Sequence, residues 1–277
     1  MNARLSPQAA ILRHAVLLIT AAIILVPFVW MISLSMKPPG EIFREHFAFL
    51  PEQWYAVQNY RKALTSAPLA RYMGNGILVC AAILTLQILI CAPCAYALAK
   101  LRFPGRDLIF GLVLIGLLLP HQVLSLPLFV LCYELGILNT YAALIFPFVV
   151  SPFGIFLFRQ VFKTIPDDVV HAARLDGLSE LGIVWKVMVP MALPAVIAFS
   201  IFSVVGRWND LFWPLIAVRS ESLMPPPLGI IAFANEEAGN DYGPLMAAAT
   251  IVILPLVIAF LAAQKWFVEG MTGGAVK

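Results

Sequence analysis

The chain has 277 residues, of which 61% are apolar and 12% charged, and its net charge is +3. Soluble domains are about 45–50% apolar and about 25% charged, so a water-soluble fold of this length could not bury so much apolar surface. The small, scattered positive charge argues against nucleic-acid binding and is typical of a cytoplasmic excess of Lys and Arg in a membrane protein. The composition therefore predicts an integral membrane protein.

Six apolar windows are long enough to cross a bilayer as helices. The first is too long for the core of a signal peptide and lacks a small-residue cleavage site, so we expect it to be retained. Prolines inside several windows predict bent helices around a central path. The sequence thus predicts an all-α polytopic protein with one transmembrane permease domain over residues 1–277. The expected spans are 12–34, 72–98, 108–131, 140–162, 187–218 and 244–267.

The charged loops indicate an orientation. The loop between the second and third spans carries Lys100, Arg102 and Arg106, whereas the loop between the third and fourth has no Lys or Arg. The positive-inside rule then places both termini and residues 164–186 in the cytoplasm. The loop over residues 35–71 departs from this pattern, because it carries five basic residues on the expected outer side.

A polar segment between the fourth and fifth spans predicts a helix–turn–helix elbow. Pro166, Asp167 and Asp168 are typical of a helix start, with Thr164 as a possible cap. Ala172-Ala173 adds a surface of little side-chain bulk, and Asp176-Gly177 is a turn dipeptide that ends the first short helix. The residues alone leave open an ordinary amphipathic loop packed on the protein's own spans.

The spacing in this elbow resembles the EAA loop of bacterial ABC-importer permeases: Glu-Ala-Ala, three residues, Gly, nine residues, then Ile-x-Leu-Pro. Here the matching residues are Ala172, Ala173, Gly177 and the stretch Val187 to Pro190. The resemblance extends to 158–160 and 165–167 before the loop, to 208–214 in the fifth span and to the tail 270–277. The similarity covers nearly the whole chain and is greatest to the carbohydrate-uptake branch, with its maltose-type and glycerol-3-phosphate-type permeases.

The resemblance implies that the elbow is a coupling helix that docks on a separate ATP-hydrolysing subunit. The implied ATPase-coupling residues are His171, Ala172, Ala173, Asp176 and Gly177. His171 stands where the family usually has Glu, which is expected to pair with a basic group on the ATPase. A neutral His cannot do so, and the resemblance leaves open whether it forms a hydrogen bond or meets a changed partner.

The resemblance also implies the partners and the cycle. We expect a heterodimer with a second permease subunit, an ATP-binding-cassette dimer, an extracytoplasmic solute-binding protein and the lipid of a bacterial inner membrane. The complex would import a carbohydrate or a related polyol or sugar phosphate by alternating access.

The chain lacks motifs for chemistry of its own. It has no G-x-x-x-x-G-K-[ST], no H-E-x-x-H and no G-x-S-x-G. We therefore predict no enzyme activity, catalytic residue, cofactor or metal. Cys91 and Cys94 have the spacing of a redox pair, but they lie in an apolar span and are interpreted as small apolar residues.

Polar residues at membrane depth are candidates for the solute path, because burying them in lipid is unfavourable. One alternative is that Arg207 and Asp210 pair with each other while the tryptophans lie in an interfacial belt. Another is that the companion permease holds most solute contacts. The candidate path residues are Gln122, Arg207, Trp208, Asn209, Asp210 and Trp213.

Two other classes of protein are weighed against this interpretation. A six-span secondary transporter would have carboxylates along its spans, and apart from Asp210 the span interiors have almost none. An intramembrane enzyme would need a nucleophile with a nearby base, and the sequence contains no such pair.

Overall fold

The structure is a computed structural model that describes residues 7–43, 48–231 and 241–272, and within these ranges the regular structure is helical. Residues 273–277 of the expected tail lie outside them. The chain divides into two compact units: residues 1–69 with 230–254, and residues 70–229 with 255–277. The described parts of each unit are considered separately.

The first unit contains α1 (Pro7–Leu34), α2 (Pro39–Ile42), α3 (Ala56–Thr65) and the first part of α15 (Tyr242–Thr272). Helix α1 is apolar on all sides, and most of its side chains are exposed, as expected of a helix that meets lipid. The segment after it is fixed by buried polar groups. Asn59 donates to the main-chain oxygens of Ser35 (3.0 Å) and Lys37 (2.8 Å), and Glu41 accepts from two main-chain N–H groups.

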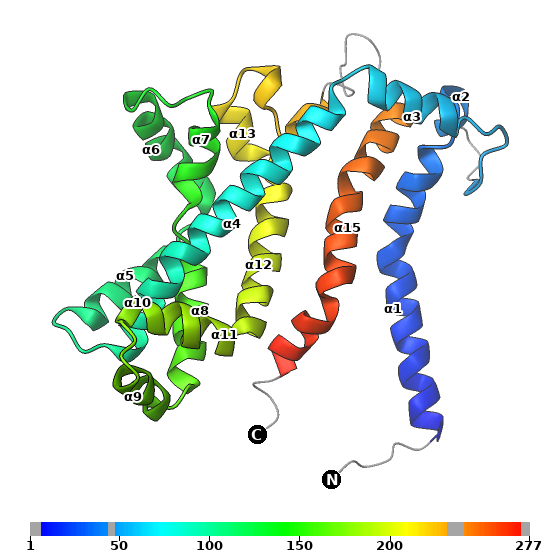
Figure 1. Ribbon diagram of the computed structural model, residues 1–277. Helices are drawn as coiled ribbons and strands as arrows, with labels where there is room; N and C mark the ends of the chain where they lie inside the picture. The colour runs from blue at the N-terminus through cyan, green and yellow to red at the C-terminus, as the bar shows by residue number, and fades with distance from the viewer. Residues whose placement is uncertain (1–6, 44–47, 232–240, 273–277) are drawn as a thin grey trace. The chain divides into compact units, whose positions relative to one another are not determined.

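The second unit contains most of the chain, from α4 (Leu69–Lys100) to α14 (Pro226–Gly229), and the remainder of α15. Helix α5 lies beside α8, and α8 lies beside α12 (Figure 1). The helices between α4 and α9 are α5 (Arg106–Leu118), α6 (His121–Glu134), α7 (Tyr141–Ile145), η1 (Phe146–Phe148) and α8 (Pro152–Thr164).

The remaining helices of this unit form the elbow and the segment that follows it (Figure 1). They are α9 (Asp167–Leu175), α10 (Glu180–Ile183), the π-helical turn η2 (Val184–Met188), α11 (Val189–Met191), α12 (Leu193–Trp208), α13 (Phe212–Ala217) and η3 (Glu221–Leu223).

Two of the apolar stretches are broken rather than continuous. The axes of α5 and α6 differ by 107° around Leu119 and Pro120, and the segments on either side of Ala192 differ by 85°. Leu119 is extended, because a residue before proline is disfavoured in the helical region. Among the described residues, four helices are long and apolar enough to cross a membrane, or up to six if each bent pair is one span.

The core of the second unit joins the C-terminal end of α4 to the elbow. Phe158, Phe162 and Met188 are fully buried there with Tyr96 and Ala173. A smaller cluster packs Trp213 and Ala217 against Ile83, Ala143 and Leu144. The two clusters pack against the middle and the C-terminal part of α4.

Candidate functional site

The elbow forms the first candidate site, and a known local geometry produces its turn. Helix α9 ends at Leu175, and Gly177 follows with φ +80°, a left-handed conformation that favours glycine. The Leu178 N–H donates to Ala173 O at 3.1 Å and the Gly177 N–H to Arg174 O at 3.0 Å, which is the hydrogen-bond pattern of a Schellman motif. The turn therefore reverses the chain as the dipeptide Asp176-Gly177 predicted.

The start of α9 differs from the expected cap. Thr164 belongs to the last turn of α8, where its hydroxyl donates to Val161 O at 2.7 Å. Pro166 occupies the cap position of α9 instead, and Asp167 and Asp168 lie in the first turn, where the helix dipole favours negative charge.

The candidate coupling residues fall on two faces of the elbow. Ala173 is buried in the unit's own core, whereas the other four are exposed: His171, Ala172, Asp176 and Gly177. Leu175 lies beside them and is 90% exposed, although the sequence reasoning did not single it out. A large apolar side chain that stands free at the tip of a polar elbow is the feature that could have identified it.

Ion pairs hold the elbow to α4. Lys100 Nζ donates to Ile165 O at 2.5 Å and to Asp167 Oδ1 at 2.6 Å. This hydrogen bond, together with the positive charge of Lys100, lowers the pKa of Asp167 below its ordinary value of 3.8. At the other end of α9, Arg174 binds Glu180 through two hydrogen bonds of 2.8 and 3.2 Å.

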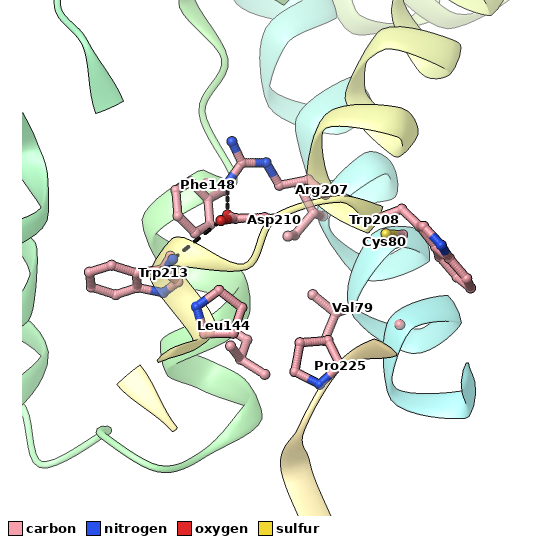
Figure 2. A pocket seen from close by; sticks show the side chains of 12 residues that line it. Val79, Cys80, Leu144, Phe148, Arg207, Trp208, Asp210, Trp213 and Pro225 are labelled. Carbon is pink, nitrogen blue, oxygen red and sulfur yellow. Dashed lines mark hydrogen bonds and ion pairs between the residues drawn. The ribbon is translucent and has the colours of Figure 1, made fainter. Parts of the chain in front are cut away.

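The second candidate site lies in the same unit, where α12 ends. Arg207 Nη1 is 3.1 Å from Asp210 Oδ2, and the guanidinium lies 4.0 Å from the centroid of the Phe148 ring (Figure 2). Asp210 also accepts the Trp213 N–H at 3.2 Å, and the Trp213 indole donates to Ala143 O at 2.9 Å. The two charged side chains therefore pair with each other, which was one of the alternatives left open by the sequence.

Two hollows flank this ion pair. One, with a volume of about 190 Å³, is lined by Gln122, Ser125, Phe148, Arg207, Asp210 and Trp213. The other, shown in Figure 2, has a volume of about 20 Å³ and lies on the side of Trp208 and Cys80. A water molecule needs about 10–15 Å³, so the larger hollow has room for several waters and the smaller one for about a single water.

The structure thus brings four of the six candidate path residues together: Gln122, Arg207, Asp210 and Trp213. Trp208 is buried and faces the smaller hollow, and the Asn209 amide donates to Val205 O of its own helix at 2.9 Å. Phe148 completes the lining, and nothing in its local sequence distinguishes it from other apolar residues of the span. Among the described residues, no cluster of three His, Cys, Asp or Glu side chains could hold a metal ion.

Bent apolar helices, a helical elbow and a polar hollow define a polytopic membrane permease. The chain belongs to the family of binding-protein-dependent transport system inner membrane components, whose model matches residues 88–273. This family is a transport component and not an enzyme. It is the permease subunit of an ABC importer, and the EAA motif and coupling helix are typical of it.

Relatives cover nearly the whole chain. AraQ, an arabinooligosaccharides transport system permease protein of Halalkalibacterium halodurans, is 35% identical over 93% of this chain and 92% of its own. NgcG, a diacetylchitobiose uptake system permease protein of Streptomyces coelicolor, is 33% identical over 97% and 89%. UgpE, an sn-glycerol-3-phosphate transport system permease protein of Brucella abortus, is 28% identical over 96% of each.

One solved structure is similar over almost its full length. A chain from the crystal structure of a bacterial ABC transporter involved in the import of the acidic polysaccharide alginate matches with a TM-score of 0.82 and 26% identity, over 96% of this chain and 99% of that chain. The family implies that this permease acts with an ATPase and a solute-binding protein in the inner membrane.

Proposed function

We propose that this permease subunit imports a carbohydrate, with an oligosaccharide favoured over a sugar phosphate. AraQ and NgcG, at 35% and 33% identity, are named for arabinooligosaccharides and diacetylchitobiose, whereas UgpE at 28% is named for sn-glycerol 3-phosphate. The hollow beside Arg207 supports a neutral solute, because Asp210 already balances the charge of the arginine.

Uptake into proteoliposomes tests the solute class. The permease is reconstituted with its companion subunit, its ATPase and its solute-binding protein, and labelled arabinotriose, diacetylchitobiose and sn-glycerol 3-phosphate are offered separately. We expect ATP-dependent uptake of an oligosaccharide probe. Uptake driven by an ion gradient without ATP would instead support a secondary transporter, and uptake of sn-glycerol 3-phosphate alone would overturn the oligosaccharide assignment.

The proposal assigns ATPase coupling to the exposed residues of the elbow: His171, Ala172, Leu175, Asp176 and Gly177. Ala172 and Gly177 leave little side-chain bulk at the turn, so a partner's backbone can approach closely, and Leu175 offers an exposed apolar side chain. Ala173 is assigned a different role, because it packs inside the permease and fixes α9 to its own core.

An Ala172→Trp variant tests this docking surface. The indole would fill the space where the ATPase is proposed to sit, so we expect the ATPase to be lost from the purified complex. Ala70→Trp is the matched control, because Ala70 is also exposed but lies at the opposite end of α4. Equal recovery of the ATPase with both variants would contradict the assignment. A His171→Glu variant, compared in the same assay, decides whether the departure from Glu affects docking.

The remaining proposals concern assembly, domain organisation and orientation. We propose that residues 1–277 act as one transmembrane domain, that the companion permease is a different chain, and that both termini lie in the cytoplasm. The basic loop residues Lys100, Arg102 and Arg106 support this orientation. Labelling of single introduced cysteines at Arg102 and at Glu134 by an impermeant maleimide on intact cells tests it, with only the latter expected to react.

We propose that solute passes the hollow lined by Gln122, Arg207, Asp210 and Trp213. Trp208 and Asn209 do not line this hollow and are proposed to hold its lining residues in position. Trp208 faces the smaller hollow, and Asn209 caps its own helix. A Gln122→Ala variant is expected to raise the KM for the transported probe with little change in the ATPase rate. An unchanged KM would remove Gln122 from the path.

A further inference from the structure

We infer that Glu180 is a positioning residue that ties the elbow to α4. When α9 is displaced, α4 then moves together with it. Five side chains form this tie, here called the α4 clamp: Tyr96, Lys100, Asp167, Arg174 and Glu180. The inference rests on the proposed role of the elbow, but it concerns where the movement goes after the ATPase has docked.

The two attachments of the clamp lie at opposite ends of α9. At the start of α9, Lys100 binds Asp167 and the carbonyl of Ile165, and the Lys100 side chain is only 5% exposed. At the end of α9, Arg174 binds Glu180 through two parallel hydrogen bonds. A helix held at one end could pivot, whereas a helix held at both ends has to move with its support.

Both attachments end on one face of α4. Glu180 Oε2 accepts a hydrogen bond of 2.5 Å from the Tyr96 hydroxyl, and Tyr96 precedes Lys100 by four residues. Residues four apart lie above one another on a helix. Glu180 is the shared element, since it accepts from Arg174 of α9 and from Tyr96 of α4 at once.

Packing around the clamp leaves α9 little freedom to slide. Val170 and Ala173 of α9 are buried in the same core as Tyr96 and Ile183. From α8, Arg159 donates to Leu98 O at 3.2 Å, and its guanidinium lies over the Phe110 ring at 3.6 Å. The inner end of α4 is therefore held by α8 as well as by the elbow.

The outer part of α4 reaches the hollow. Gln87 donates to Phe148 O at 2.8 Å and accepts from Ser203 at 2.6 Å, and Phe148 lines the hollow under Arg207. From Lys100 to Gln87 the helix rises about 20 Å at 1.5 Å per residue. A movement of the elbow thus has a route through α4, whose hydrogen-bond ladder lacks only the N–H of Pro93 in this stretch, to the residues of the proposed solute path.

The test separates docking from transmission. Tyr96→Phe and Glu180→Gln are made in the assembled importer, and three quantities are measured: ATPase recovered with the permease, ATP hydrolysed, and uptake of the oligosaccharide probe that the unaltered importer takes up. We expect the ATPase to remain bound and active while uptake per ATP falls at least about fivefold in Glu180→Gln. Glu134→Gln, an exposed carboxylate outside the clamp, is the matched control and is expected to change nothing.

Two results would overturn the inference. In one, uptake and hydrolysis fall in parallel, so that uptake per ATP is unchanged and Glu180 only supports the fold or the docking. In the other, both clamp variants have the uptake per ATP of the unaltered protein. Tyr96→Phe removes a single hydroxyl, so it keeps the test valid if Glu180→Gln does not fold. Recovery of coupling in the charge-exchanged pair Arg174→Glu with Glu180→Arg would support the inference further.

A distance measurement gives a readout that needs no solute. Spin labels are attached to cysteines introduced at Asp168 and Arg102 after the four native cysteines are replaced by alanine. With the clamp intact, we expect the distance between the labels to be the same with and without ATP. In Glu180→Gln, we expect the distribution of distances to broaden during ATP turnover. A change in this distance on ATP binding with the clamp intact would overturn the inference, even if docking through Ala172 and Leu175 stands.

Discussion

Asp210 lies 3.1 Å from the guanidinium of Arg207 and also accepts the main-chain N–H of Trp213, so one carboxylate joins the end of α12 to the start of α13. Both charged side chains are less than one-fifth exposed. The pair gives the hollow hydrogen-bonding groups without net charge, and it fixes the backbone where the apolar segment is interrupted.

Breaking this pair from one side is expected to destabilise the protein more than removing it altogether. Asp210→Asn leaves the Arg207 charge partly buried beside Phe148, and the expected loss is about 3 kcal/mol. The double variant Arg207→Met with Asp210→Asn is expected to lose less than Asp210→Asn alone, and so less than the sum of the two single variants. Thermal unfolding of the purified protein in detergent measures the three differences. Additive losses would mean that the two side chains do not interact energetically.

The exposed Leu175 is expected to anchor the ATPase. Its side chain stands free at the tip of the elbow, so burying it in a partner removes apolar surface from water. Leu175→Ser is expected to weaken binding of the ATPase about tenfold, measured by titration of the labelled ATPase onto the permease in nanodiscs. Leu135→Ser, at a comparably exposed leucine after α6, serves as the control. Equal weakening by both would assign the effect to general loss of apolar surface.

The attachment between Lys100 and Asp167 is expected to lose strength in acid. The pKa of Asp167 is lower in the folded protein than its ordinary value of 3.8, so its stabilising contribution is present above that value and is lost as the pH falls through the folded pKa. Asp167→Asn is therefore expected to lower stability at neutral pH, and its difference from the unaltered protein is expected to shrink below pH 3.8 and to vanish once the pH is below the folded pKa. A difference in stability that is independent of pH would show that Asp167 contributes by packing.

The elbow could be predicted from sequence because its turn depends on local chemistry. In the dipeptide Asp176-Gly177, the glycine readily adopts the left-handed conformation that ends α9. The spacing of Ala172, Gly177 and Pro190 matches that of the EAA loop. The hydrogen bond from Tyr96 to Glu180 could not be predicted, since the two residues are far apart in the sequence and only the fold brings them together.

The candidate solute path could be predicted in part. Arg207 lies in the last turn of α12 and Asp210 follows two residues after its end, so their separation by three residues places them within reach of each other. Trp208, the next residue after Arg207, points to the smaller hollow instead. Gln122 joins them only because the chain bends by 107° around Leu119 and Pro120. Proline indicates that a bend is present, but the packing of the neighbouring helices determines its direction.

Two glycines of the second unit are expected to respond differently to alanine. Gly177 has φ +80° and open space where a Cβ would lie, so Gly177→Ala has only a conformational cost, about 1 kcal/mol. A Cβ at Gly229 would clash with the Tyr72 ring, and Tyr72 is buried with its hydroxyl bound to Glu221 at 2.9 Å. Gly229→Ala is therefore expected to cost more, up to about 3 kcal/mol, because the ring has to move.

A compensating change distinguishes these two causes. Tyr72→Leu shortens the side chain that meets the new methyl group, so the Gly229→Ala, Tyr72→Leu double variant is expected to unfold at a higher temperature than Gly229→Ala alone. The same second change is expected to give Gly177→Ala no benefit, because its cost comes from the backbone. Thermal unfolding of the four proteins in one detergent provides the comparison. Failure of Tyr72→Leu to recover any stability would show that the close approach of Gly229 to the ring does not limit this position.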